Sequence, residues 1–139
     1  MIEETSAGIV IFRKEESKKL FLFLHYPSGN WDFVKGKMEK GEKTHETAIR
    51  ETKEETGITD ITFVENFEEW INYNFKYQGE LVQKKVVFFL AETKTKEIEI
   101  SHEHSGYTWM DYNSAMEKTT FDNAKTVLTK AQKLLSNTL

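Results

Sequence analysis

Residues 36–58 of this chain read GKMEKGEKTHETAIRETKEETGI, and they carry the pattern from which the fold can be argued. The pattern turns helical at Thr44, a candidate N-cap, and Gly57 stands where a helix would end. The side chains expected to face the interior form a modest stripe at helical spacing: Ala48, Ile49 and Thr52. We therefore expect a helix over 44–56, preceded by a polar loop over 37–43.

Three glutamates on this helix, Glu51, Glu54 and Glu55, stand at positions i, i+3 and i+4 and so share one face. Like charges at these spacings cost about 0.2 to 0.5 kcal/mol per pair, and each carboxylate raises the pKa of its neighbours unless a positive charge lies between them. A divalent cation would neutralise the cluster. Mg²⁺ prefers oxygen ligands and commonly joins carboxylates to substrate phosphates, so this face fits a magnesium site.

The same helix has a simpler interpretation, because glutamate-rich helices are often solvated faces. Arg50 stands four residues from both Glu46 and Glu54, and such pairs are ordinary surface ion pairs. Two features of the flanks favour a functional site instead. Lys35-Gly36 ends an expected strand, and Arg50 can reach back toward Glu42 to tie the loop to the helix.

Gly36, Glu42 and the run from Arg50 to Ile58 together resemble the Nudix box, the signature of the Nudix hydrolases, with every fixed position present. Thr52 is the one departure, since the family usually has an aliphatic residue at this packing position. The resemblance implies an α/β fold in which a mixed β-sheet is sandwiched between α-helices. It also implies hydrolysis of a nucleoside diphosphate linked to another moiety. The residues it assigns to the metal site are Glu51, Glu54, Glu55 and Gly36, and those with structural roles are Glu42 and Gly57.

The chemistry of that reaction explains the need for carboxylates. A diphosphate linkage is anionic and repels hydroxide, so cations must screen its charge, lower the pKa of the attacking water and stabilise the leaving phosphate. Mg²⁺ is the expected cofactor, with Mn²⁺ as a substitute. Glu51, Glu54 or another nearby carboxylate would take the proton of the water, and we place Arg50 with them in the catalytic set.

Outside the box, the chain is similar to the asymmetrical diadenosine tetraphosphate hydrolases, a Nudix subgroup, from the first expected strand to the last helix. The most telling segment is Ser101-His102-Glu103-His104. By resemblance, Glu103 brings a further carboxylate to the metal site as a ligand or as the base. His102 and His104 are either exposed loop residues or groups that bond phosphate or orient Glu103. Because hard cations favour oxygen over imidazole, neither histidine joins the metal set.

The same resemblance suggests which residues bind the substrate. Stacking on an aromatic ring is worth about 1 to 3 kcal/mol per nucleobase, and Tyr73 and Phe121 are the candidates, although aromatic residues are more often part of a core. Lys84 or Lys85 would contact the polyphosphate from a strand. Because strand neighbours face opposite ways, only one of them can point into the cleft, and we favour Lys84. The other substrate contacts are expected from Lys35, His102 and Lys125.

We hypothesise that water attacks a phosphorus of diadenosine tetraphosphate with Mg²⁺ assistance, releasing AMP and ATP. Two departures from the subgroup leave room for other substrates: Lys37 replaces a frequent histidine, and Phe33-Val34 stand where prolines are frequent. The rivals are a pyrophosphohydrolase of nucleoside triphosphates or of RNA 5′ ends, a diphosphoinositol polyphosphate phosphatase, and a nucleotide sensor without turnover. The complete box argues against the sensor, because a pure binder has no use for the whole array.

The bulk composition sets the remaining limits. A chain of 139 residues with 38% hydrophobic residues can fill one core, so we expect residues 1–139 to form a single domain. A net charge of −4 argues against binding duplex nucleic acid, since that affinity comes from many Lys and Arg contacts. Because the chain has no cysteine, disulfides and thiolate metal sites are excluded. No apolar run is long enough to span a membrane. We expect a cytoplasmic protein, a monomer, acting on a small molecule.

The rest of the chain is expected to be mostly β-sheet with one further helix. Apolar, β-branched and aromatic runs predict strands over 7–12, 20–24, 31–34, 61–67, 70–77, 81–93, 98–100 and 107–110. The run from Val86 to Leu90 is continuous enough to be a central strand buried on both faces. Apolar residues at helical spacing over 121–135 predict an amphipathic helix packed on the sheet.

Overall fold

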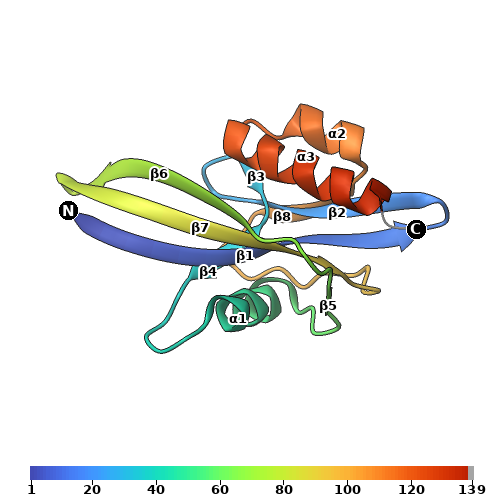
Figure 1. Ribbon diagram of the computed structural model, residues 1–139, viewed down its shortest axis with the longest axis horizontal. Helices are drawn as coiled ribbons and strands as arrows, with labels where there is room; N and C mark the ends of the chain where they lie inside the picture. Colours follow the sequence, from blue (N-terminus) through green and yellow to red (C-terminus); the bar gives the residue numbers. More distant parts are fainter. Residues whose placement is uncertain (138–139) are drawn as a thin grey trace.

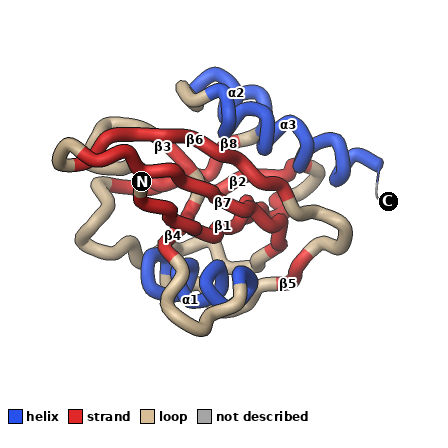
Figure 2. Tube along the Cα trace, turned by 60° about the vertical axis from the view of Figure 1, so that its left-hand side comes forward, coloured by secondary structure: helices blue, strands red, loops and turns tan. Residues whose placement is uncertain are grey.

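A computed structural model describes residues 1–137, and the last two residues of the expected domain, Thr138 and Leu139, lie outside the described residues. A mixed β-sheet forms the centre of the molecule, with one helix on one face and two helices on the other (Figures 1 and 2). This arrangement confirms the α/β class and the layered order expected from the sequence. Within residues 1–137, no helix is long and apolar enough to cross a membrane.

The elements have the following bounds. The strands are β1 Ile2–Glu15, β2 Lys18–His25, β3 Trp31–Asp32, β4 Val34–Lys37, β5 Thr62–Phe63, β6 Glu69–Tyr77, β7 Glu80–Glu92 and β8 Gly106–Met110. The helices are α1 Thr44–Thr56, α2 Tyr112–Lys118 and α3 Asp122–Asn137.

The centre of the sheet is a parallel pair, β1 and β7, in register from Ile2 opposite Val82 to Phe12 opposite Glu92. The other pairings are antiparallel: β2 and β4 join β1, β3 and β8 join β2, and β5 and β6 join β7. Alternate residues of β7 enter two cores, since Phe88 packs in the cluster with α3 and Phe89 in the cluster with α1. The expectation of a central strand buried on both faces is confirmed.

One expected strand is wrong, one is much shorter than expected, and one helix was not expected. The strand expected over 61–67 is reduced to the two residues of β5, and residues 98–100 form no strand. The chain there lies along the end of α1 instead, where the Glu99 amide donates to the Thr56 carbonyl at 3.1 Å. Helix α2 begins after Asp111, whose carboxylate caps it by accepting from the Ser114 amide at 2.8 Å.

Helix α1 begins and ends as the sequence indicates, but its N-cap is Lys43, not Thr44. Glu46 accepts a hydrogen bond from the Lys43 amide at 2.8 Å, which satisfies one of the free donors of the first turn. At the other end Gly57 takes a left-handed conformation, φ 78°, that favours glycine. Ile49 was wrongly assigned to the interior, since 45% of it is exposed.

Candidate active site

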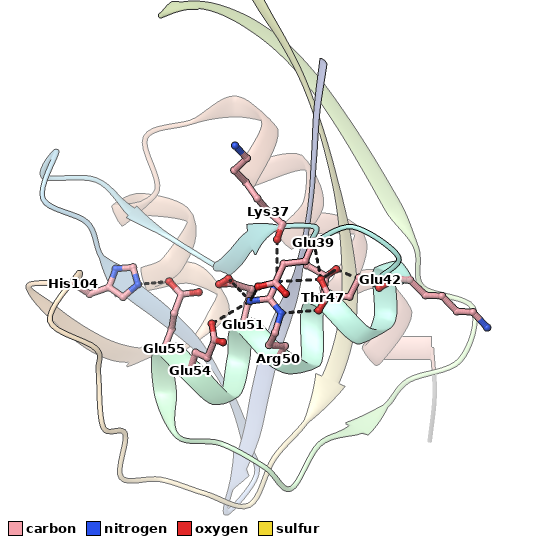
Figure 3. Close-up of polar contacts among 10 residues, drawn as sticks. Lys37, Glu39, Glu42, Thr47, Arg50, Glu51, Glu54, Glu55 and His104 are labelled. Atoms are coloured by element: carbon pink, nitrogen blue, oxygen red, sulfur yellow. Dashed lines mark hydrogen bonds and ion pairs between the residues drawn. The ribbon is translucent and has the colours of Figure 1, made fainter. Parts of the chain in front are cut away.

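The loop before α1 is tied to the helix by an ion pair between Glu42 and Arg50 (Figure 3). The guanidinium donates to both carboxylate oxygens, from Nε at 2.6 Å and from Nη2 at 3.1 Å, which is the bidentate geometry that only arginine provides. Thr47 adds a third donor to the Glu42 carboxylate at 2.6 Å. The hydrogen bond from Arg50, then one from the Glu39 amide at 3.0 Å and that from Thr47, lower the pKa of Glu42 to about 2, so Glu42 is an anion at neutral pH.

Arg50 also faces the catalytic candidates. Its Nη1 lies 3.2 Å from Glu54 Oε2 and 3.5 Å from Glu51 Oε2, while Nη2 donates to the Lys37 carbonyl at 3.0 Å (Figure 3). One guanidinium therefore fixes the polar loop, through Glu42 and Lys37, and partly neutralises the carboxylate face of α1. The predicted tie between Arg50 and Glu42 is confirmed.

Glu51 lies against the backbone of β4. A β-carbon built at Gly36 would lie 1.9 Å from both Cδ and Oε2 of Glu51, so only glycine leaves room for this carboxylate. Burial, together with the negative charge of Glu55, raises the pKa of Glu51 to about 7. The Lys35-Gly36 pair at the end of a strand thus makes a cradle for one carboxylate of the helix.

Glu55 is buried at the other end of the carboxylate face, beside the loop that carries Glu103. Its Oε1 is 2.5 Å from Nε2 of His104, and the Ser101 amide donates to its backbone carbonyl at 3.2 Å. Burial and the charge of Glu103 raise the pKa of Glu55 to about 7, while burial lowers the pKa of His104. A loop more than forty residues downstream is in this way joined directly to the helix.

These groups surround an open cleft of about 540 Å³, which we call the carboxylate cleft. It is lined by residues from the turn after β2, from β4 and the following loop, from α1 and from the 101–105 loop: Tyr26, Lys35, Gly36, Lys37, Met38, Glu39, Arg50, Glu51, Glu55, Glu103 and His104. Glu54 does not line it and lies at its edge, with 56% of its side chain exposed and an ion pair to Arg50. Most residues of the predicted metal and catalytic sets are therefore brought together.

The donors present suit a divalent cation. Among residues 1–137, no group of three His, Asp or Glu side chains is arranged to bind a metal ion. Glu51 and Glu54 are paired with Arg50, and Glu55 is paired with His104. Two observations nevertheless fit a cation at the cleft: Glu51 is cradled by a position that tolerates no β-carbon, and Glu55 Oε2 is buried without a hydrogen-bond partner. Carboxylate oxygens are the ligands that Mg²⁺ and Mn²⁺ accept.

A second cavity of about 300 Å³ lies on the α3 side of the sheet, and we call it the aromatic cavity. Both predicted stacking residues, Tyr73 of β6 and Phe121 before α3, line it and are partly exposed. Lys35 lines this cavity as well as the carboxylate cleft, and its Nζ is held by Asp32 at 2.9 Å. The two cavities are therefore adjacent and share one positively charged residue, Lys35.

Three predicted substrate contacts lie outside both cavities. Lys84 is on the same sheet face as Tyr73, its register partner, but its Nζ is 3.4 Å from Glu4, which also holds Lys37 at 3.1 Å. His102 is exposed on its loop, and Lys125 lies on α3 beyond the cavity wall. Their part in substrate binding stays a prediction.

Sequence reasoning missed Tyr26 and Asp32. Tyr26 lines the carboxylate cleft, donates to the Phe33 carbonyl at 2.8 Å and sets its ring against that of His104 at 4.7 Å. Asp32 lines the aromatic cavity and fixes Lys35. The one available signal was position, since both residues flank the turn that precedes Lys35-Gly36.

The chain is similar to proteins of known name along nearly its whole length. Residues 3–131 match the family model described as the NUDIX domain. Bis(5'-nucleosyl)-tetraphosphatase (asymmetrical) of Mus musculus is 34% identical over 145 residues, covering 96% of this chain and 96% of that protein. The protein of the same name from Caenorhabditis elegans is 33% identical, covering 94% of this chain and 96% of that protein.

A solved structure shows the same similarity in three dimensions. The binary complex of C. elegans Ap4A hydrolase matches this structure with a TM-score of 0.87 at 32% identity, covering 97% of this chain and 99% of that one. The likeness therefore includes the segments that form both cavities, in addition to the helix with the carboxylates.

Proposed function

Because the chain belongs to the Nudix family and is a Nudix pyrophosphohydrolase, we propose that it hydrolyses diadenosine tetraphosphate to AMP and ATP with Mg²⁺. The observation that carries this proposal is the position of Lys35, which lines both the aromatic cavity and the carboxylate cleft. A ligand with a nucleobase at the end of a polyphosphate needs this combination: an aromatic surface, a cation beside it, and carboxylates beyond. The names of the relatives agree with it.

In the proposed complex, one adenine enters the aromatic cavity between Tyr73 and Phe121. Stacking of this kind is worth about 1 to 3 kcal/mol per base and requires no particular hydrogen bond. Lys35 then meets the first phosphates, and the polyphosphate continues into the carboxylate cleft. Asp32 keeps the ammonium of Lys35 at the boundary of the two cavities.

Glu51, Glu55 and Glu103 would hold the divalent cation, since all three line the carboxylate cleft. The cation, when bound, supplies positive charge that screens the polyphosphate and acidifies water. Arg50 limits the repulsion among the carboxylates and keeps the loop over 37–43 in place.

Glu54 is the base in this proposal, because it is the most exposed of the three clustered glutamates, Glu51, Glu54 and Glu55, and Arg50 keeps it near the cleft. The water oxygen forms a bond to one phosphorus, the bridging P–O bond on its far side breaks, and Glu54 takes a proton from the water. The leaving phosphate carries the electron pair of the broken bond. AMP and ATP account for all atoms of the dinucleotide plus one water.

The test is to incubate the purified protein with diadenosine tetraphosphate and Mg²⁺ and to resolve the nucleotides by ion-exchange chromatography. AMP and ATP in equal amounts are expected, and two molecules of ADP or no turnover would contradict the proposal. Glu54→Gln should lower kcat by about 10²-fold or more while circular dichroism stays unchanged. Glu65→Gln, at an exposed glutamate away from both cavities, is the matched control and should leave kcat unchanged.

A second candidate substrate is an RNA 5′ end, and one observation favours it. Phe75 follows Tyr73 on the same face of β6, with ring centroids 6.2 Å apart, and Tyr77 continues the row. A row of exposed rings suits successive bases of a single strand. Relative kcat/KM for the dinucleotide and for a 5′-triphosphorylated oligonucleotide decides between the two.

A further inference from the structure

The Glu55–His104 pair is the most buried ionisable contact at the carboxylate cleft. The two side chains are only 7% and 3% exposed, and Nε2 of His104 lies 2.5 Å from Oε1 of Glu55 (Figure 3). The other oxygen, Oε2, is buried and has no hydrogen-bond partner, although Glu55 lines the cleft. One oxygen of the Glu55 carboxylate is therefore hydrogen-bonded to the protein, and the other is available to a ligand.

The protonation state of Glu55 determines which nitrogen of His104 carries the hydrogen. A glutamate that binds a cation is ionised and only accepts hydrogen bonds, so in that state Nε2 of His104 donates and Nδ1 is bare. Nδ1 is buried without a partner, which a neutral ring tolerates better than a charged one. A neutral donor holds Glu55 without adding a positive charge that would compete with a cation.

His104 is itself held firmly from three sides. Its amide donates to the Ser101 carbonyl at 3.1 Å, the Tyr26 ring packs edge-on at 4.7 Å, and the next amide, of Ser105, donates to the His25 carbonyl at 2.8 Å. Glu103 is the adjacent residue and lines the same cleft. Any displacement of His104 therefore moves both Glu55 and Glu103.

We propose that His104 is a positioning residue for the divalent cation: it occupies Oε1 of Glu55, leaves Oε2 for the cation, and holds the adjacent Glu103 at the same cleft. This inference rests on the metal-assisted part of the proposed function but not on the identity of the substrate. His104 touches neither substrate nor cation. Its contribution is to make Glu55 a one-oxygen ligand and to join two carboxylates that come from different parts of the chain.

The test is the affinity of the protein for Mn²⁺ alone, measured by the electron paramagnetic resonance signal of free Mn²⁺, with no nucleotide present. His104→Leu removes the donor and should weaken binding about 10- to 100-fold, the usual effect of losing a group that orients a metal ligand. His104→Gln places an amide donor near the position of Nε2 and should restore affinity to within a few-fold. His104→Asn is too short to reach Glu55 and should resemble His104→Leu.

His45→Leu is the matched control, because His45 is an exposed histidine that stacks on Phe89 away from the cleft. It should bind Mn²⁺ as the parent does. Equal affinity of His104→Leu and the parent would overturn the inference. Equal losses in His104→Leu and His104→Gln would also overturn it, because they would mean that the hydrogen bond donated to Glu55 is not what supports the binding of Mn²⁺. If the parent binds Mn²⁺ but does not cleave the dinucleotide, the proposed function fails while the inference on His104 stands.

Discussion

Gly36 and Glu51 are in such close contact that the glutamate carboxylate occupies the volume a β-carbon of residue 36 would need. Gly36→Ala should therefore displace Glu51 from the cleft and lower kcat about 10²-fold or more, as expected for a carboxylate moved away from a reacting phosphate. Stability should change little, because the side chain can turn toward solvent. Gly106→Ala is the control, since its β-carbon would meet nothing closer than His25 at 4.0 Å. Unchanged kcat in Gly36→Ala would show that Glu51 is dispensable.

Substitutions in the aromatic cavity should change KM and leave kcat almost unchanged. Tyr73→Ala and Phe121→Ala each remove one wall of the cavity, and the loss of about 1 to 3 kcal/mol of stacking corresponds to a rise in KM of about 5- to 150-fold. Steady-state kinetics with the dinucleotide measures it. Tyr77→Ala, at a ring that is 60% exposed and outside the cavity, should leave KM unchanged for this substrate. An equal effect of all three variants would speak against a defined base site.

The bidentate pair predicts that lysine cannot replace Arg50. Lys has no planar fork, so Arg50→Lys should lose the paired hydrogen bonds to Glu42 and lower the urea midpoint of unfolding. In a double-mutant cycle with Glu42→Gln, the two changes should be strongly non-additive because they break the same contact. Additive losses would mean that the pair is not coupled.

The raised pKa values of Glu51 and Glu55 predict that the metal-free protein loses stability as pH rises. Each folded-state pKa is about 7 against an ordinary value of 4.5, so the folded state holds more protons than the unfolded one between these pH values. Stability from these groups is present below pH 4.5 and is lost as pH passes 7. Thermal unfolding of the protein in a chelator at several pH values measures it.

The same pH series has an internal control in Glu51→Gln. This variant lacks one of the two titrations, so it should gain on the parent by on the order of 1 kcal/mol between pH 5 and pH 8. Saturating Mg²⁺ should remove the difference in slope, because the cation replaces the proton as the partner of the carboxylates. A parallel pH dependence of parent and variant without metal would contradict the assignment.

Local patterns in the sequence were enough to predict the extent of α1 and the ion pair between Arg50 and Glu42. The end of the helix at Gly57 was predicted from backbone preference, and the buried strand over 86–90 was predicted from its continuous apolar run. The pair between Arg50 and Glu42 joins residues only eight positions apart. Because none of these features depends on a distant segment, their predictions were correct.

Features that depend on distant segments could not be predicted in the same way. His104 meets Glu55 across 49 positions, and nothing in the sequence around either residue shows which one the other faces. The segment over 98–100 looks like a strand but finds the end of α1 as its partner. Helix α2 is only seven residues long, too short for a periodic pattern to stand out.

The parallel pairing of β1 with β7 has a consequence for biosynthesis, since it joins residues as far apart in the chain as Ile2 and Val82. Closing so large a loop costs entropy before any contact compensates for it, and non-local pairings of this kind slow folding. Strand β4, which contains Gly36, pairs with β1. A nascent chain therefore exposes the glutamate-rich helix before β7, the parallel partner of β1, has been translated. The 101–105 loop follows β7 in the chain, so the carboxylate cleft can be completed only at a late stage of synthesis.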